Sequence, residues 1–117
     1  MKVKEILNVL EAELIAGPEN LEMDIQSGCG ADLMSDVMAY VKESVVLLTG
    51  LVNPQVIRTA EMMDIKVIAF VRGKDVTPAM VALAEEKGIT LLKTELPMFI
   101  ACGKLYSAGL TRRGVRD

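Results

Sequence analysis

Hydrophobic residues along this chain follow two different periods. Between Val3 and Leu10 they recur every three or four positions, which predicts an opening amphipathic helix. A short apolar segment, 13–16, comes next. Further on, residues 45–49 and 66–71 are continuous runs of mostly aliphatic residues, as is typical of strands buried on both faces of a parallel sheet. The pattern therefore predicts a chain that mixes helices with buried strands.

Helix start signals lie between these strands. Asn53-Pro54 combines a capping side chain with a residue of preset φ, and it predicts a helix to about residue 64. Thr77-Pro78 predicts another helix, 78–87, which ends at a glycine. A last strand around residues 91–92 and a final helix after Pro97 complete the series. The final helix is expected to turn four side chains towards the sheet: Met98, Cys102, Leu105 and Tyr106.

A glycine-rich segment precedes the first buried strand. Residues 24–27 predict a short strand that leads into a glycine loop, and a helix that ends near residues 43–44 follows. Gly28 and Gly30 would let the loop take a positive φ or approach a ligand closely, while Asp32 is placed to cap the helix.

The order of elements predicts the fold class. Strands that alternate with helices need right-handed crossovers, so we expect a single-domain, three-layer α/β sandwich with a mostly parallel sheet of four to five strands. The carboxyl ends of parallel strands share one edge, where open α/β sheets bind ligands. We therefore expect a rim made by residues 27–30, Thr49-Gly50, Arg72-Gly73 and Thr94.

Composition narrows the class of protein. A length of 117 residues suits one domain, and 51% hydrophobic residues with a mean hydropathy of +0.36 suggest a buried subunit interface, hence a homodimer. No apolar run approaches the ~18 residues that a membrane span needs, and no secretory signal is apparent, so we expect a cytoplasmic protein. The net charge of −3 argues against nucleic acid as a partner.

The chain is expected to form one domain over residues 1–110. Residues 111–117, which include three arginines, are expected to be a flexible basic tail.

The reactive side chains are few. Cys29 and Cys102 are far apart and provide neither a disulfide framework nor a zinc-ligand set, and Cys102 suits the core. Cys29 could be a redox-sensitive or nucleophilic thiol, but the chain has no histidine to act as its base. The segment from Gly28 lacks the third glycine of a dinucleotide-binding fingerprint, since Leu33 stands there. No metal site or cofactor is expected, because the aspartates 24, 32 and 36 lack the spacing of a dedicated cation loop.

Several short motifs occur in an order that resembles a known family. They are the segment 28–38 with Asp-Leu-Met-Ser-Asp-Val-Met at its centre, the opening helix with Val3-Lys4-Glu5-Ile6, the turn at 17–21, Asn53 after the central strand, and Leu92-Lys93-Thr94 before a helix. This order is similar to that of DRTGG domains and of the related N-terminal domain of HPr kinase/phosphorylases. The motif that names the family is not intact, because Asp24-Ile25-Gln26-Ser27-Gly28 stands at its place. The resemblance implies an α/β module with a regulatory or dimerising role. It does not imply kinase activity, because the chain has no G-x-x-x-x-G-K-[ST] phosphate loop.

Three hypotheses follow. The first is a non-catalytic regulatory and dimerisation module that binds a small polar ligand at the carboxyl ends of its strands. The second is a redox sensor or small enzyme that uses Cys29, and the third is a structural subunit of a larger redox or phosphotransfer assembly. For the first hypothesis, the candidate ligand-binding residues are Ser27, Gly28, Cys29, Gly30, Asp32, Ser35, Thr49, Gly50, Asn53 and Thr94.

Overall fold

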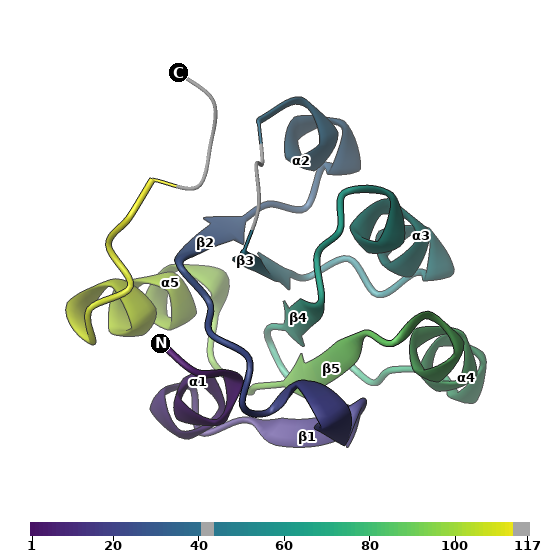
Figure 1. Ribbon diagram of the computed structural model, residues 1–117, viewed down its shortest axis with the longest axis horizontal. Helices are drawn as coiled ribbons and strands as arrows, with labels where there is room; N and C mark the ends of the chain where they lie inside the picture. Colours follow the sequence, from purple (N-terminus) through teal and green to yellow (C-terminus); the bar gives the residue numbers. More distant parts are fainter. Residues whose placement is uncertain (41–43, 114–117) are drawn as a thin grey trace.

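The computed structural model describes residues 1–40 and 44–113. Helices and strands alternate along most of the chain (Figure 1). In chain order the elements are α1 (Val3–Val9), β1 (Glu13–Ala16), a short 3₁₀ helix (Pro18–Asn20), β2 (Ser27–Gly30), α2 (Met34–Tyr40), β3 (Val45–Thr49), α3 (Pro54–Met62), β4 (Val67–Phe70), α4 (Pro78–Lys87), β5 (Thr90–Lys93) and α5 (Met98–Ser107).

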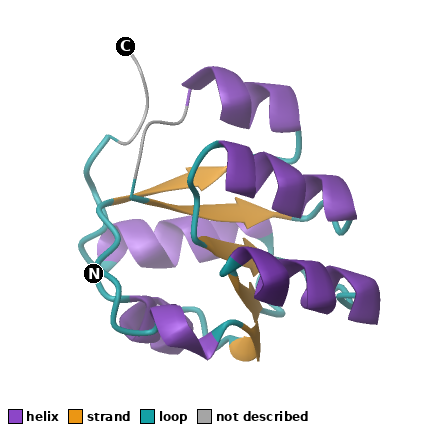
Figure 2. Ribbon diagram, turned by 45° about the vertical axis from the view of Figure 1, so that its right-hand side comes forward, coloured by secondary structure: helices purple, strands orange, loops and turns teal. Residues whose placement is uncertain are grey.

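The five strands form one sheet in the order β1-β5-β4-β3-β2. Strands β2 to β5 are parallel neighbours, and β1 pairs antiparallel with β5 at one edge. Figure 2 shows the sheet between two helical layers. The predicted α/β sandwich with a mostly parallel sheet is confirmed, and the apolar segment 13–16 is its antiparallel edge strand.

Two hydrophobic cores lie on opposite faces of the sheet. Along β3, Val45 and Leu47 pack in the core under α2, α3 and α4, whereas Val46 and Leu48 pack in the core under α1 and α5. This alternation arises because successive side chains of a strand point to opposite faces. Both cores bury their apolar residues almost completely, which explains why β3 and β4 are uninterrupted hydrophobic runs.

The glycine segment differs from the prediction. Residues 27–30 are not a loop but strand β2, which pairs in register with β3 from Ser27–Val45 to Gly30–Leu48. Neither Gly28 nor Gly30 has a positive φ. Strand pairing depends on backbone N–H and C=O groups, and glycine has these like any other residue. The low strand propensity of glycine therefore did not prevent β2 from pairing with β3. The predicted strand at 24–27 is largely loop, with an isolated bridge from Asp24 to Lys2. The predicted helix end near residues 43–44 falls partly outside the described residues.

Helix α5 packs on the sheet differently from the expectation. Ala101 and Leu105 are its buried residues, Cys102 is half-buried, and Tyr106 is 65% exposed. Tyr106 follows Leu105 directly and lies about 100° further round the helix, which turns it away from the buried side that Ala101 and Leu105 form. The prediction that placed Tyr106 towards the sheet is therefore wrong in this respect.

Candidate functional site

The carboxyl ends of the parallel strands meet at one edge, and Asp32 connects two of them. Its carboxylate accepts hydrogen bonds from the backbone N–H of Gly50, at 2.7 Å, and from the hydroxyl of Thr49, at 3.3 Å. Thr49 is the last residue of β3, and Asp32 lies two residues after the end of β2. The side chain expected to cap α2 therefore joins the loop after β2 to the turn after β3, while α2 begins at Met34.

Two cationic side chains from the turn after β4 reach the same place. Lys74 donates from Nζ to the carbonyl oxygen of Gly50 at 2.7 Å. Arg72 lies with Nη2 3.5 Å from a carboxylate oxygen of Asp32. We call Asp32, Thr49, Gly50, Arg72 and Lys74 the rim cluster. The hydrogen bond from Gly50, then that from Thr49 and the charges of Arg72 and Lys74, lower the pKa of Asp32, so its charged form is favoured in the fold.

The structure brings together only part of the predicted site. Asp32, Thr49 and Gly50 are in contact, and Gly30 ends β2 at the same edge. Three predicted residues lie at another edge or have their polar groups bonded within the fold. Ser27 begins β2, so it lies at the amino end of the strand. Thr94 donates its buried hydroxyl to the carbonyl oxygen of Leu10, and Asn53 caps α3 by accepting from the N–H of Gln55.

Two further predicted residues lie outside the rim cluster. Ser35 is exposed on α2, and Cys29 packs beside the core under α2, α3 and α4. Arg72 was expected at the rim but was absent from the candidate ligand-binding residues, and Lys74 was missed. The signal for both was the charged turn Arg72-Gly73-Lys74-Asp75 immediately after a buried strand, because such a turn must lie at the carboxyl edge.

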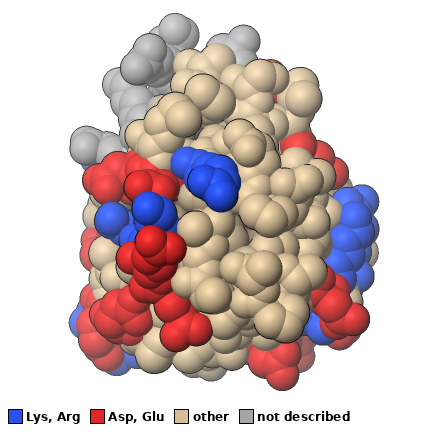
Figure 3. Space-filling model, turned by 90° about the vertical axis from the view of Figure 1, so that its right-hand side faces the viewer, with Lys and Arg blue, Asp and Glu red and all other residues tan. Residues whose placement is uncertain are grey.

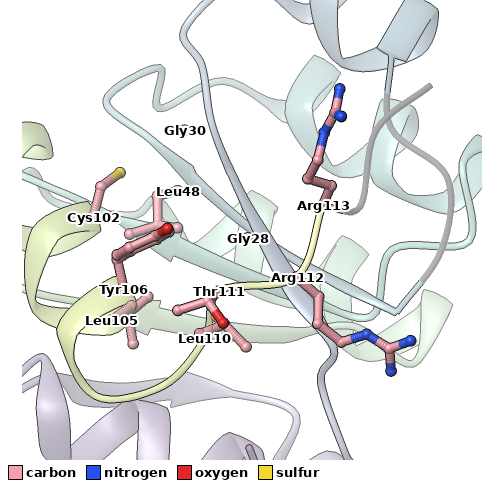
Figure 4. Close-up of a pocket in the computed structure, with 10 residues that line it drawn as sticks. All are labelled: Gly28, Gly30, Leu48, Cys102, Leu105, Tyr106, Leu110, Thr111, Arg112 and Arg113. Atoms are coloured by element: carbon pink, nitrogen blue, oxygen red, sulfur yellow. The ribbon is translucent and has the colours of Figure 1, made fainter. Parts of the chain in front are cut away.

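Gly28 and Gly30 face a separate hollow on the other side of the sheet. It has a volume of about 340 Å³ and lies between β2, α5 and the segment 110–113. We call it the α5 pocket. Figure 4 shows Cys102 and Tyr106 from α5 beside the two glycines, with Leu110 and Thr111 on the segment that follows α5. That segment runs beside β2, where Arg112 forms an isolated parallel bridge with Ser27.

The two cysteines lack the properties of activated thiols. Burial raises the pKa of Cys29 above its ordinary value, and the nearby Cys102 and Asp36 raise it further. Burial also raises the pKa of Cys102. Since the thiolate is the nucleophile, both shifts reduce reactivity at neutral pH. Within residues 1–40 and 44–113, no group of three or more acidic or cysteine side chains is arranged to hold a metal ion.

Comparison with known proteins shows the fold. The sequence matches no family model. A search of curated proteins gives no match either. The fold is similar to that in the crystal structure of the CBS and DRTGG domains of the regulatory region of Clostridium perfringens pyrophosphatase complexed with activator, diadenosine tetraphosphate. The two share 15% sequence identity with a TM-score of 0.68, and the match covers 97% of this chain but 47% of that chain. The similarity supports the DRTGG-like fold, while the relation to HPr kinases stays a prediction.

Proposed function

We propose that this chain is a non-catalytic regulatory module that binds a small polar ligand at the rim cluster. The similarity in fold to the regulatory region of a pyrophosphatase supports a regulatory role. That region is in complex with a nucleotide activator, which makes a small-molecule ligand a reasonable expectation for a domain of related fold. The observation that carries the proposal is the convergence of Arg72 and Lys74 on Gly50.

The rim cluster has the chemistry of a site for an anionic group. Lys74 and Arg72 are exposed residues, and the side chain of Arg72 keeps 46% of its surface accessible. Asp32 holds the backbone of Gly50 in place and lies beside Arg72, and the carboxylate of Glu95 lies over the α-carbon of Gly73, the residue between the two cations. A guanidinium and an ammonium group side by side favour a carboxylate or phosphate group of a ligand.

The non-catalytic character of the module rests on its side chains. The chain contains no histidine, and burial makes Cys29 less acidic than an ordinary thiol. The usual groups for proton transfer and nucleophilic attack are therefore lacking at Cys29. The alternative of a Cys29-dependent redox sensor or enzyme has no support from the environment of this thiol.

Self-association is the second part of the proposal. Within residues 1–40 and 44–113, large exposed apolar side chains occur on α2, α3 and the turns before them (Leu33, Met38, Leu51 and Met62) and on α5 (Phe99, Ile100 and Tyr106). Figure 3 shows that the side of the molecule on which α3 and α4 lie has a mostly uncharged middle, with charged groups gathered towards its edges. Exposed apolar surface rimmed by charges is typical of protein interfaces.

The location of the protein in the cell stays a prediction. Within the described part of the chain, no helix has the length and apolarity that crossing a bilayer requires.

Thermal unfolding in the presence of small anions tests the ligand proposal. A ligand that binds only the folded state raises the melting temperature, so inorganic phosphate, acetyl phosphate and ADP serve as probes. We expect at least one probe to stabilise the protein, and Arg72→Gln or Lys74→Gln to abolish that stabilisation. Arg58→Gln, an exposed change on α3, is the matched control and should leave it intact. No stabilisation by millimolar probes, or full stabilisation of both rim variants, would overturn the rim site.

Sedimentation equilibrium at several protein concentrations tests self-association separately. We expect a dimer that dissociates on dilution. Met62→Lys should weaken the dimer if the surface of α2 and α3 forms the interface, and Phe99→Lys should weaken it if the surface of α5 does. A monomer at all concentrations would contradict the dimer without affecting the ligand proposal.

A further inference from the structure

The α5 pocket is distinct from the rim cluster. Its lining contains none of the five rim-cluster residues, and it lies on the α5 side of the sheet. Its polar lining residues are Tyr106 and Cys102 on α5 and Thr111, Arg112 and Arg113 on the segment after it. A molecule in this pocket would therefore contact β2, α5 and the segment after α5 at the same time.

Gly28 keeps the pocket open without being needed for packing. A Cβ atom at Gly28 would have Leu110, Val46 and Leu48 as its nearest neighbours, at the ordinary contact distances of 3.6–3.8 Å. The backbone there is extended, so a larger residue would fit the strand. Glycine inside a strand lowers stability relative to a residue with a side chain, and it often marks a close approach by a ligand or another backbone. Gly28 therefore contributes no side chain to the α5 pocket, which leaves room there for Leu110 and for an occupant.

The lining defines the chemistry of that occupant. Leu48, Leu105 and Leu110 are apolar lining residues that are themselves buried, while Tyr106 is a residue with 65% of its surface exposed. Thr111, the residue after Leu110, is a lining residue that carries a hydroxyl group. Figure 4 shows the guanidinium ends of Arg112 and Arg113 directed away from Tyr106 and Thr111. These walls suit a flat, uncharged ring with hydrogen-bonding groups at its edge.

The size of the pocket limits the ligand further. Its volume of about 340 Å³ is at the lower end of the range of roughly 300–1,000 Å³ for small-molecule sites. A single ring system with a small substituent fits such a volume, and a dinucleotide does not. We propose that the α5 pocket binds a small uncharged heteroaromatic compound of nucleobase or nucleoside size, stacked on Tyr106, with Thr111 bonding its edge. This second site is independent of the rim cluster.

Nuclear magnetic resonance of the full ¹⁵N-labelled chain tests the proposal with adenosine as the probe. We expect shifts of the amide signals of Gly28, Gly30 and Thr111 on titration. Tyr106→Ala should raise the dissociation constant roughly five-fold or more, which is the lower end of the effect of base stacking on an aromatic side chain. Thr111→Val, which keeps the shape of the side chain and removes the hydroxyl, should weaken binding to a smaller extent. Gly28→Leu should abolish binding by filling the hollow.

Matched controls distinguish binding in the α5 pocket from binding elsewhere on the protein. Ser107→Ala removes an exposed hydroxyl of α5 that does not line the pocket and should leave adenosine binding unchanged. Since Tyr106 and Thr111 are both exposed, their variants should fold even if Gly28→Leu does not. Arg72→Gln should bind adenosine normally, so failure of the rim site and failure of this site are distinguishable.

Four outcomes with adenosine or benzyl alcohol would overturn the proposal, and a fifth concerns AMP. The first two are an absence of amide shifts with millimolar adenosine and shifts that are confined to the rim cluster. The third is undiminished adenosine binding by Tyr106→Ala. The fourth is that benzyl alcohol, which lacks the ring nitrogens, binds as tightly as adenosine. AMP could also bind more tightly than adenosine and lose this advantage when Arg112 and Arg113 are replaced by Gln. That result would show that the site selects anions, and it would contradict the proposal of an uncharged ligand.

Discussion

Arg72 lies directly over the α-carbon of Gly50. A Cβ atom at position 50 would be 1.8 Å from Nη2 of Arg72 and 2.7 Å from Cζ, so the guanidinium occupies the space that any side chain at position 50 would need. This contact joins the turn after β3 to the turn after β4 and holds Arg72 near Asp32.

Gly50→Ala is therefore expected to separate stability from ligand binding. The colliding atoms belong to the end of a flexible side chain, so the guanidinium can move aside and the free energy of unfolding should fall by less than about 1 kcal/mol. Phosphate-dependent stabilisation should be lost, because Arg72 no longer lies in the rim cluster. Urea unfolding and thermal unfolding with phosphate measure the two effects. Unchanged phosphate stabilisation would show that the position of Arg72 is irrelevant to binding.

Asp32→Asn should reveal a pH-dependent contribution to stability. The amide oxygen can still accept from Gly50, but the charge is lost. Because the fold lowers the pKa of Asp32, the native state favours the carboxylate. The advantage of the wild type over the variant should be fully present above the ordinary pKa, about 3.9, and disappear as the pH falls through the lower folded value. The side chain is 53% exposed, so the advantage should not exceed about 1 kcal/mol.

Urea unfolding of both proteins between pH 7 and pH 3 measures this difference. Glu85→Gln, an exposed change on α4, is the control for loss of one negative charge. A difference between wild type and Asp32→Asn that stays constant across the whole range would contradict the assignment.

Gly28→Ala and Gly30→Ala should have opposite effects although both glycines lie in β2. A Cβ at Gly30 would be 2.8 Å from Sγ of Cys102 and 3.2 Å from Sδ of Met98, so these side chains or α5 itself must shift and the variant should lose about 1–3 kcal/mol. At Gly28 the same atom makes ordinary contacts, so the variant should be unchanged or gain up to about 1 kcal/mol. Thermal unfolding of the pair checks the prediction, which fails if both variants behave alike.

Gly17→Ala and Gly88→Ala form a second pair with similar backbone conformations. Their φ angles are +73° and +70°, and each alanine therefore costs about 1–2 kcal/mol for its left-handed conformation. At Gly17 the Cβ would also lie 2.5 Å from the carbonyl oxygen of Ile89, whereas nothing lies within 4 Å at Gly88. We expect Gly17→Ala to be clearly the more destabilising in chemical denaturation. Equal losses would mean that the backbone of β5 moves away easily.

Cys29 should react slowly with iodoacetamide at neutral pH. Its raised pKa leaves little thiolate, so the alkylation rate should continue to increase well above pH 8.5, the ordinary midpoint for a thiol. Mass spectrometry of peptides containing Cys29 and Cys102 at graded pH gives both rates. Rapid modification of Cys29 below pH 7 would revive the redox hypothesis.

The sequence predicted most accurately the elements whose pattern depends on burial. Residues 45–49 are a strand as predicted, because a strand covered on both faces is apolar at nearly all positions, here from Val45 to Leu48. Residues 78–87 are the predicted helix, since Thr77 caps it and Gly88 ends it in a left-handed conformation. Strand β2 could not be predicted in the same way, because its two glycines carry no side chains that report burial.

The sequence by itself determined the α/β class, most of the buried strands and the edge at which their carboxyl ends lie, because hydrophobic period and helix caps are local properties. Only the tertiary structure decided that Asp32 reaches Gly50, that Arg72 and Lys74 meet it there, and that Gly28 opens onto a pocket beneath α5. These contacts join residues from neighbouring strands or from the two ends of the chain. They exist only once the strand order β4-β3-β2 and the packing of α5 against β2 are established.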